Sequence, residues 1–464
     1  MRQILILLTF LFLGAASLPA ETPLSAEMKA KIDQGVTDLL AQTGPPSASI
    51  AVVLDGKLAY AQAYGTARLA EKLKATPEMR YSIGSISKQF TAAGLLLLAQ
   101  EGKISLDDQL AHWLPELTRA RDITLRQLLS MTAGYQDFWP QDYVMPMMRK
   151  PVTPQEIASR WGRRPLDFEP GAKWQYSNTN YVIVGLIIEK VSGEPVFSFL
   201  QKRILGPLQM KSVVNSDAAA LGPGDAQRYL RYAGGPPRIA PKEGSGWMFA
   251  AGELAMTASD LARWDISLID QSLLAPESYH ALETEVRLNS GVGSGYGLGV
   301  GLSLVNGRRR VSHSGEVSGF TAANDVFPDD RVAVAVLVNM DATGASQQIA
   351  TKIEDIVFAK SDPATPAALD RMRSIFTALQ HGELDRSLLT DNANAYFTKE
   401  AIADYATALG ALGEPEKFEQ TGQGLRGGMT FRRYEIKFPK KMLRLTAYLL
   451  PDGKIEQYQI APAE

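Results

Sequence analysis

Strand-like segments stand far apart in this sequence, with a long stretch of different character between them. Residues 47–64 read as strand, turn, strand around the hairpin signal Asp55-Gly56. Residues 309–339 hold further strand patterns, with a second turn at 328–330. The stretch 105–265 reads mostly as helices joined by Pro-rich loops. This order predicts one sheet closed by sequence-distant strands, with the helical middle as a large insertion beside it, an α/β (α+β) fold.

The two ends of the chain differ from this central part. Residues 1–20 combine one positive charge, an apolar run and a small-residue exit, which predicts a cleaved secretory signal peptide and an exported, periplasmic or secreted protein. The apolar run is too short to span a bilayer comfortably, so we expect no stable membrane span after cleavage. An uncleaved anchor is the alternative reading.

A composition change marks the other end. Residues 361–368 are predicted to be a linker after a domain covering 21–360. Residues 369–464 read as two helices followed by strands, which predicts a small α+β domain. This pattern resembles the NTF2-like domains appended to some exported hydrolases.

Composition excludes several classes of function. The 464 residues carry 48 Lys and Arg against 50 Asp and Glu, so no basic excess supports nucleic-acid binding. Cysteine is absent, which excludes disulfides and a cysteine nucleophile. The 4 His residues lie far apart in sequence, which makes a histidine-based zinc site a poor expectation. We therefore expect neither metal nor organic cofactor.

Three short elements have the residue types of nucleophilic catalysis. Ser85-Ile86-Ser87-Lys88 precedes an apolar helical run, and residues three apart on a helix share a face, so Lys88 can reach the Ser85 hydroxyl. Tyr176-Ser177-Asn178 places a phenol and an amide on one side of a loop. His313-Ser314-Gly315 ends a strand, where small residues leave the backbone open to a substrate. Each element alone has an ordinary structural reading as a cap, a turn or a packed strand end.

In this order, the three elements resemble those of the serine β-lactamase and penicillin-binding-protein superfamily. The likeness is to its class C-like branch, which includes D-aminopeptidases, DD-carboxypeptidases and esterases, and it covers about residues 25 to 360. It implies an antiparallel sheet flanked by helices, with a large helical subdomain. It also implies that Ser85 is acylated and that Lys88 and Tyr176 are catalytic, Tyr176 as a phenolate formed beside a cation.

The resemblance also implies the binding residues. Asn178 would orient Lys88 and an amide of the substrate, and His313, Ser314 and Gly315 would bind the substrate along a strand edge. The backbone N–H groups of Ser85 and Glu316 would hold the oxyanion.

One departure from the family pattern bears on the substrate. The β-lactam-hydrolysing members usually carry Lys-Thr-Gly at the third element, whereas this chain has His313, whose charge varies near neutral pH. We therefore expect a serine hydrolase for a small-molecule ester, amide or D-amino-acid peptide. A β-lactamase or penicillin-binding DD-peptidase is the alternative, and a catalytically silent binding or sensor protein is the alternative from another class. The sequence leaves the oligomeric state open.

Overall fold

The sequence-distant strands meet in one antiparallel sheet, as predicted. The computed structural model describes residues 24–359 and 364–463, so the predicted signal peptide lies outside the described residues. Strand β1 (Ser47–Leu54) pairs with β12 (Val332–Val338), and Ala48 lies opposite Val338. The order across the sheet is β3-β2-β1-β12-β11-β10-β9. The remaining strands are β2 (Lys57–Arg68), β3 (Leu73–Lys74), β9 (Gly301–Val305), β10 (Arg308–Val317) and β11 (Phe320–Phe327).

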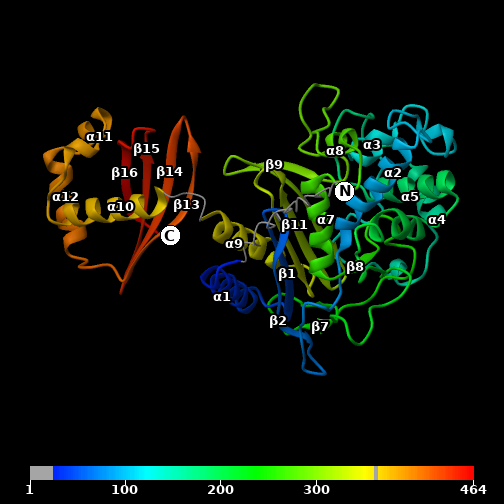
Figure 1. The fold of residues 1–464 in the computed structure, drawn as a ribbon, viewed down its shortest axis with the longest axis horizontal. Helices are drawn as coiled ribbons and strands as arrows, with labels where there is room; N and C mark the ends of the chain where they lie inside the picture. The colour runs from blue at the N-terminus through cyan, green and yellow to red at the C-terminus, as the bar shows by residue number, and fades with distance from the viewer. Residues whose placement is uncertain (1–23, 360–363, 464) are drawn as a thin grey trace, which may run out of the picture.

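The central strands are buried on both faces, and their alternating residues belong to two separate cores. In β1, Ile50 and Val52 pack with α1 (Ala26–Thr43) and α9 (Ala345–Ala359). Ala51 and Val53 face the opposite side, where α7 (Ala258–Asp270) packs against β1 and β12. This period-2 division places helices on both faces of the sheet, and Figure 1 shows this layering.

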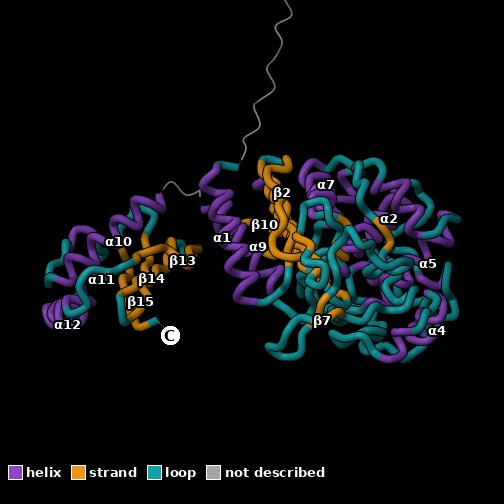
Figure 2. Tube along the Cα trace, turned by 90° about the horizontal axis from the view of Figure 1, so that it is seen from below, coloured by secondary structure: helices purple, strands orange, loops and turns teal. Residues whose placement is uncertain are grey.

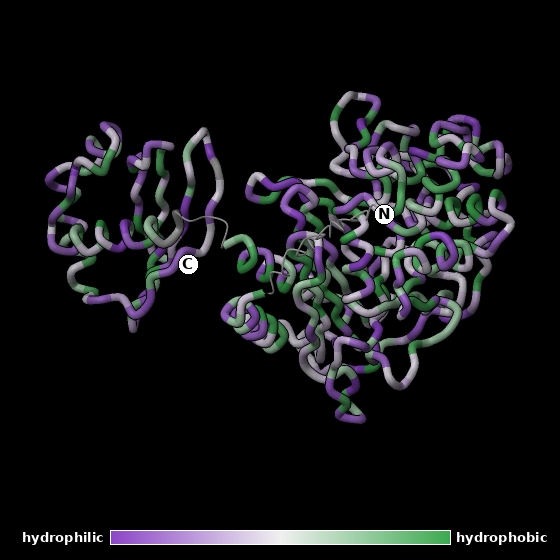
Figure 3. The backbone as a smooth tube through the Cα atoms, viewed as in Figure 1, coloured by the Kyte–Doolittle hydropathy of each residue, from purple (hydrophilic) through white to green (hydrophobic). Residues whose placement is uncertain are grey.

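The helical subdomain contains more loop than the sequence predicted for 105–265. Its central helices α2 (Ser87–Gln100) and α5 (Asn178–Ser192) are apolar on almost every side and are therefore buried rather than amphipathic. Pro and Gly in the intervening segments hold much of the rest in turns and short strands. Figure 3 shows hydrophobic residues in the sheet and its covering helices, with hydrophilic residues common in the peripheral loops. The longer elements are α2 (Ser87–Gln100), α3 (Leu125–Leu129), α4 (Pro154–Gly162), α5 (Asn178–Ser192), α6 (Val196–Leu200) and α8 (Pro276–Leu282); the short strands are β4 (Tyr81–Ser82), β5 (Val214–Asn215), β6 (Tyr229–Leu230), β7 (Arg238–Ile239) and β8 (Leu254–Met256).

The C-terminal segment forms a unit with its own core of helices against one face of a four-stranded antiparallel sheet, counted over the described part of the chain. Figures 1 and 2 show this unit as a separate body. Helix α10 begins at Ala364, so the prediction of a linker through 368 was too long. The prediction also missed α11, a single turn capped by Thr390. The elements are α10 (Ala364–Gln380), α11 (Asp391–Tyr396), α12 (Lys399–Gly410), β13 (Lys417–Arg426), β14 (Met429–Phe438), β15 (Lys441–Leu449) and β16 (Ile455–Pro462).

The α+β character of this unit is as predicted, and its likeness to NTF2-like domains stays a prediction. Across residues 24–359 and 364–463, we find no helix with the length and apolar character needed to cross a bilayer.

Candidate active site

Ser85 lies in a tight turn that joins the sheet side of the molecule to the first helix of the helical subdomain. The turn is a 3-10 helix (Gly84–Ile86) between β4 and α2. Gly84 has φ +52°, and a Cβ atom there would lie 2.7 Å from the backbone nitrogen of Glu316. A side chain at this position would both strain the backbone and collide with β10. Glycine therefore lets the turn that carries Ser85 lie directly against the strand that carries His313 and Gly315.

Lys88 is fully buried in the first turn of α2 and has three polar neighbours. Its Nζ lies 2.8 Å from Ser85 Oγ, 2.8 Å from Asn178 Oδ1 and 2.8 Å from the carbonyl oxygen of Ala251. The contact with Asn178 joins two of the sequence elements, since Lys88 and Asn178 are 90 residues apart in the chain. Ala251 is a residue that the sequence did not single out, because any residue type provides a carbonyl group.

These contacts suit Lys88 to act as a base. Burial lowers the pKa of Lys88 to about 7, although the carboxylate of Asp137 opposes that shift. A neutral amine has two N–H donors and one lone pair. Asn178 Oδ1 and the Ala251 carbonyl can only accept, so they take the two N–H groups. The lone pair is then directed at the Ser85 hydroxyl.

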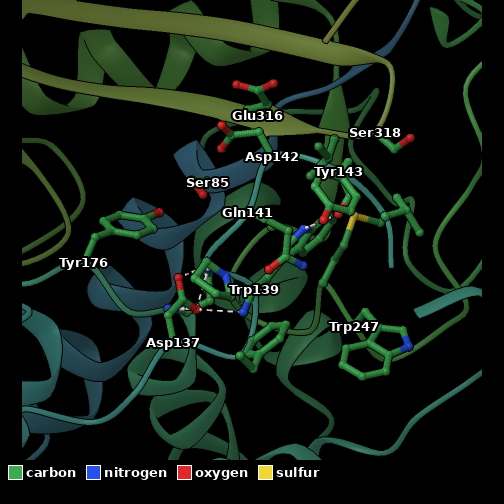
Figure 4. Close-up of a pocket in the computed structure, with 18 of the residues that line it drawn as sticks. Ser85, Asp137, Trp139, Gln141, Asp142, Tyr143, Tyr176, Trp247, Glu316 and Ser318 are labelled. Atoms are coloured by element: carbon green, nitrogen blue, oxygen red, sulfur yellow. Dashed lines mark hydrogen bonds between the residues drawn. The ribbon is translucent and has the colours of Figure 1, made fainter. Parts of the chain in front are cut away.

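Tyr176 faces the same hydroxyl, and the centre of its ring lies 4.9 Å from Lys88 Nζ. Figure 4 shows the phenol oxygen pointing toward Ser85. Burial raises the pKa of Tyr176 well above its ordinary value, and the neighbouring Ser85 hydroxyl offsets this only in part. This direction favours a neutral phenol over the phenolate that we expected, and the lowered pKa of Lys88 makes its amine the better base of the two. Within the described residues, the buried hydroxyl of Tyr176 has no hydrogen-bond partner.

Asn178 is held by a carboxylate that sequence reasoning missed. Asn178 is the first residue of α5, and its backbone N–H donates to Asp137 Oδ1 at 3.0 Å. Its side-chain Nδ2 lies 3.2 Å from each oxygen of the same carboxylate. The Nδ2 group that we expected to contact the substrate is thus committed to Asp137. Asp137 lies in a loop outside the three sequence elements, and its sequence neighbours did not mark it as a functional residue.

His313 is half-buried on β10 and is neutral near pH 7. Burial, together with the nearby Lys88, lowers the pKa of His313 to about 4. Its Nδ1 donates to the carbonyl oxygen of Ser314 at 2.5 Å, so Nε2 accepts from the hydroxyl of Tyr296 at 2.9 Å. His313 therefore supplies no fixed positive charge for a substrate carboxylate, whereas we had expected partial charge.

The strand edge approaches the Ser85 turn very closely at Gly315. A Cβ atom at Gly315 would lie 1.9 Å from the Ile83 carbonyl oxygen and 3.3 Å from the Ser85 nitrogen. The end of β10 is fixed by carboxylates that accept from the next turn: Glu243 from Ser318 N at 2.9 Å and Asp341 from Gly319 N at 2.9 Å. The backbone nitrogens of Ser85 and Glu316, which we predicted as oxyanion donors, are thus brought together beside the Ser85 side chain.

A cavity of about 920 Å³ opens above Ser85, Asn178 and His313. Its wall includes the aromatic side chains of Phe138, Trp139 and Trp247, whereas the neighbouring Tyr135 is buried in the core and does not line the cavity. The charged side chains of the lining are mainly acidic. Figure 4 shows two of them, Asp142 and Glu316, near one another beside Ser85. The lining carboxylates are Asp137, Asp142, Asp167, Glu316 and Asp341, against the guanidinium of Arg164.

The arrangement suits acyl transfer to a serine and contains the groups for it: a nucleophile, a buried amine, a phenol and paired backbone donors. Within the part of the chain that the structure describes, no three His, Asp or Glu side chains gather in a way that could hold a metal ion.

Comparison with known proteins places this site in a family. The model of the family described as Beta-lactamase matches residues 32–357. Protein flp of Staphylococcus aureus (strain MW2) is 28% identical over 329 residues, which are 69% of this chain and 64% of that protein, so the chain spans less than two thirds of this relative. Penicillin-binding protein 4* of Bacillus subtilis is 29% identical over 381 residues, which are 77% of this chain and 82% of that protein.

Among solved structures, a D-stereospecific amidohydrolase from Streptomyces sp. is similar to the first unit. It is 29% identical, with a TM-score of 0.61, and the match covers 69% of this chain and 96% of that one.

Proposed function

This chain belongs to the beta-lactamase family, and we propose that it is a serine hydrolase that cleaves a small ester or amide through an acyl-enzyme on Ser85. The observation that carries the proposal is the surrounding of Lys88 Nζ, which lies 2.8 Å from Ser85 Oγ while two acceptors occupy its N–H groups. A serine hydroxyl needs a base to become a nucleophile, and a buried amine with a pKa of about 7 is suited to that task.

In the proposed reaction, Ser85 Oγ attacks the substrate carbonyl and its proton passes to Lys88 Nζ. The carbonyl oxygen becomes an oxyanion between the backbone N–H groups of Ser85 and Glu316. The bond to the leaving group then breaks as a proton is delivered to that group. Tyr176, a neutral phenol whose hydroxyl faces Ser85, gives its own proton to the leaving group. It then receives a proton from Lys88, which returns Lys88 to the neutral amine. Water next attacks the acyl carbon, gives a proton to Lys88 and releases the acid as Ser85 regains its hydrogen.

We propose that the preferred substrate carries an ammonium group rather than a carboxylate, as a D-amino-acid amide does. The mainly acidic lining of the cavity and the neutral His313 support this preference. The committed Nδ2 of Asn178 supports it too, because that group is not free to bind an acylamide. The similarity to a D-stereospecific amidohydrolase is consistent with the same class of substrate.

The test compares D-alanyl-p-nitroanilide with its N-acetyl derivative at pH 7, using wild type and Ser85→Ala. We expect kcat/KM to be about tenfold or more higher for the free amine, which corresponds to about 1.4 kcal/mol, and no turnover by Ser85→Ala. The L-enantiomer tests stereochemistry, p-nitrophenyl butyrate tests ester cleavage and nitrocefin tests the β-lactamase alternative. If no substrate is turned over and intact-protein mass shows no acyl adduct with any of them, the proposal fails. The alternative of a catalytically silent binding protein would then stand.

Export is a separate proposal, supported by residues 1–20. The mass of the protein recovered from a periplasmic fraction tests it, since cleavage after Ala16 or Ala20 is expected. Recovery of the full-length chain from the cytoplasm would refute it.

A further inference from the structure

The amide of Asn178 could adopt two orientations that differ only in which end faces Lys88. With Oδ1 toward Lys88, Asn178 accepts an N–H and leaves the amine lone pair for Ser85. With Nδ2 toward Lys88, it would donate to that lone pair and remove it from the reaction. Function of the proposed base therefore depends on what holds the far end of this amide.

Asp137 is the group at that far end. Its carboxylate lies 3.2 Å from Asn178 Nδ2 through each oxygen, and a carboxylate can only accept. The same carboxylate accepts from the backbone N–H groups of Asn178 at 3.0 Å and of Trp139 at 3.1 Å. The Trp139 contact closes a turn on the loop, and the Asn178 contact ties that loop to the N-terminus of α5, whose partial positive charge favours an anion. Figure 4 shows Asp137 near Trp139 among the residues that line the cavity.

We infer that Asp137 is a positioning residue: it fixes the side-chain amide of Asn178 with Oδ1 toward Lys88, so that the Lys88 lone pair stays directed at Ser85. The inference rests on the proposed function, in which Lys88 is the base for Ser85. Asp137 does not touch the reacting atoms and acts through Asn178.

Asp137 also acts on Lys88 through its charge. The ionisable groups that face Lys88 are Asp137, Tyr176, Tyr181 and His313. The two tyrosines and His313 are neutral near pH 7, because burial raises the pKa of each tyrosine and lowers that of His313. Asp137 is thus the negative charge that opposes the depression of the Lys88 pKa. Its removal should lower that pKa further and move the acid limb of the reaction to lower pH.

Asp137→Asn is the test, because it keeps the shape of the side chain and removes both the charge and one acceptor. The full chain is treated with a fluorophosphonate from pH 5 to 9, and the rate of Ser85 labelling is followed by intact-protein mass. We expect wild type to show an acid limb with a midpoint near 7. In Asp137→Asn we expect the plateau rate to fall about tenfold or more and the midpoint to move to lower pH.

Two further variants separate positioning from loss of structure. Asp260→Asn removes a buried carboxylate in the first turn of α7 that accepts from the backbone N–H and the hydroxyl of Ser212. The charge of Asp260 is not among those that act on Lys88, so this variant is expected to leave the midpoint unchanged. In an Asn178→Ala background, Asp137→Asn should lower the plateau rate little further, because no amide remains to be oriented. Circular dichroism melts establish that each variant folds. If Asp137→Asn does not fold, the midpoint is read from Asp137→Glu, which keeps the charge and should keep the wild-type midpoint at a reduced plateau rate.

The outcomes distinguish the inference from the proposed function. If wild type shows an acid limb and Asp137→Asn has the same midpoint, the inference is overturned and the proposed function is not. The same holds if Asp137→Asn lowers the plateau rate as much in the Asn178→Ala background as it does in wild type. A shifted midpoint in Asp137→Glu would also overturn it. A wild-type protein whose Ser85 is unlabelled at every pH would overturn the proposed function and, with it, this inference.

Discussion

Adding one methyl group at Gly315 should slow the reaction strongly while leaving the fold in place. The Cβ of Gly315→Ala would lie 1.9 Å from the Ile83 carbonyl oxygen. A carbon and a carbonyl oxygen approach to about 3.3 Å in ordinary contacts, so β10 and the Ser85 turn must separate by about 1.4 Å. The backbone nitrogens of Ser85 and Glu316 lie on the two sides of this contact and would move apart with it.

The size of the effect follows from that displacement. A misplacement of about 1 Å costs about 100-fold in rate, and loss of one oxyanion donor costs about 100- to 1,000-fold in kcat. We therefore expect kcat on the preferred p-nitroanilide to fall at least about 100-fold. Overpacking should lower the free energy of unfolding by about 1–3 kcal/mol, measured by urea denaturation.

The matched control is Gly301→Ala on the neighbouring strand β9. A Cβ atom there would meet the Ser312 carbonyl oxygen at 3.4 Å, and Gly301 does not touch the Ser85 turn. This variant should retain wild-type kcat within about threefold. If Gly315→Ala also keeps kcat within that range, the close approach of β10 is not needed for the reaction, and the assignment of the two nitrogens as oxyanion donors fails.

Three further predictions concern charge and domain organisation. Because His313 is already neutral, His313→Gln should leave the acid limb near pH 7 in place, and a limb that disappears would show that His313, not Lys88, titrates there. Glu354 is buried beside Asp325, and its pKa is raised to about 8, so its stabilising effect is complete below its unfolded pKa and is lost as pH rises through 8. Urea unfolding of wild type at pH 5.5 and 8.5 should show that loss, about 1–3 kcal/mol, and Glu354→Gln should reduce it; an equal pH dependence in both proteins would assign it elsewhere. A chain ending at residue 360 should keep Ser85 labelling, because the C-terminal unit has a core of its own; loss of labelling in a folded truncation would show that the unit contributes to the site.

Some features of this protein follow from the sequence because they depend on short stretches of chain. The strand-like runs and hairpin turns of 47–64 and 309–339 predicted the sheet, since strand preference and turn signals are local properties of the chain. The spacing of Ser85 and Lys88 predicted their contact for the same reason, because residues three apart share a helix face. Two predictions were less accurate: residues 105–265 contain more loop than expected, and a helix begins inside the predicted linker. Local residue preferences are weak, and the packing of the folded chain can override them.

The tertiary structure alone decided the charge states and the partners of the site. Burial lowers the pKa of Lys88 and raises that of Tyr176, which suits the roles proposed for them, and this desolvation depends on every element packed around the two side chains. Asp137 and the Ala251 carbonyl became part of the site because chain folding brought an unremarkable loop and a backbone oxygen within hydrogen-bond distance. A sequence lists the groups that can react, whereas burial and long-range contacts determine which protons they hold and which way they face.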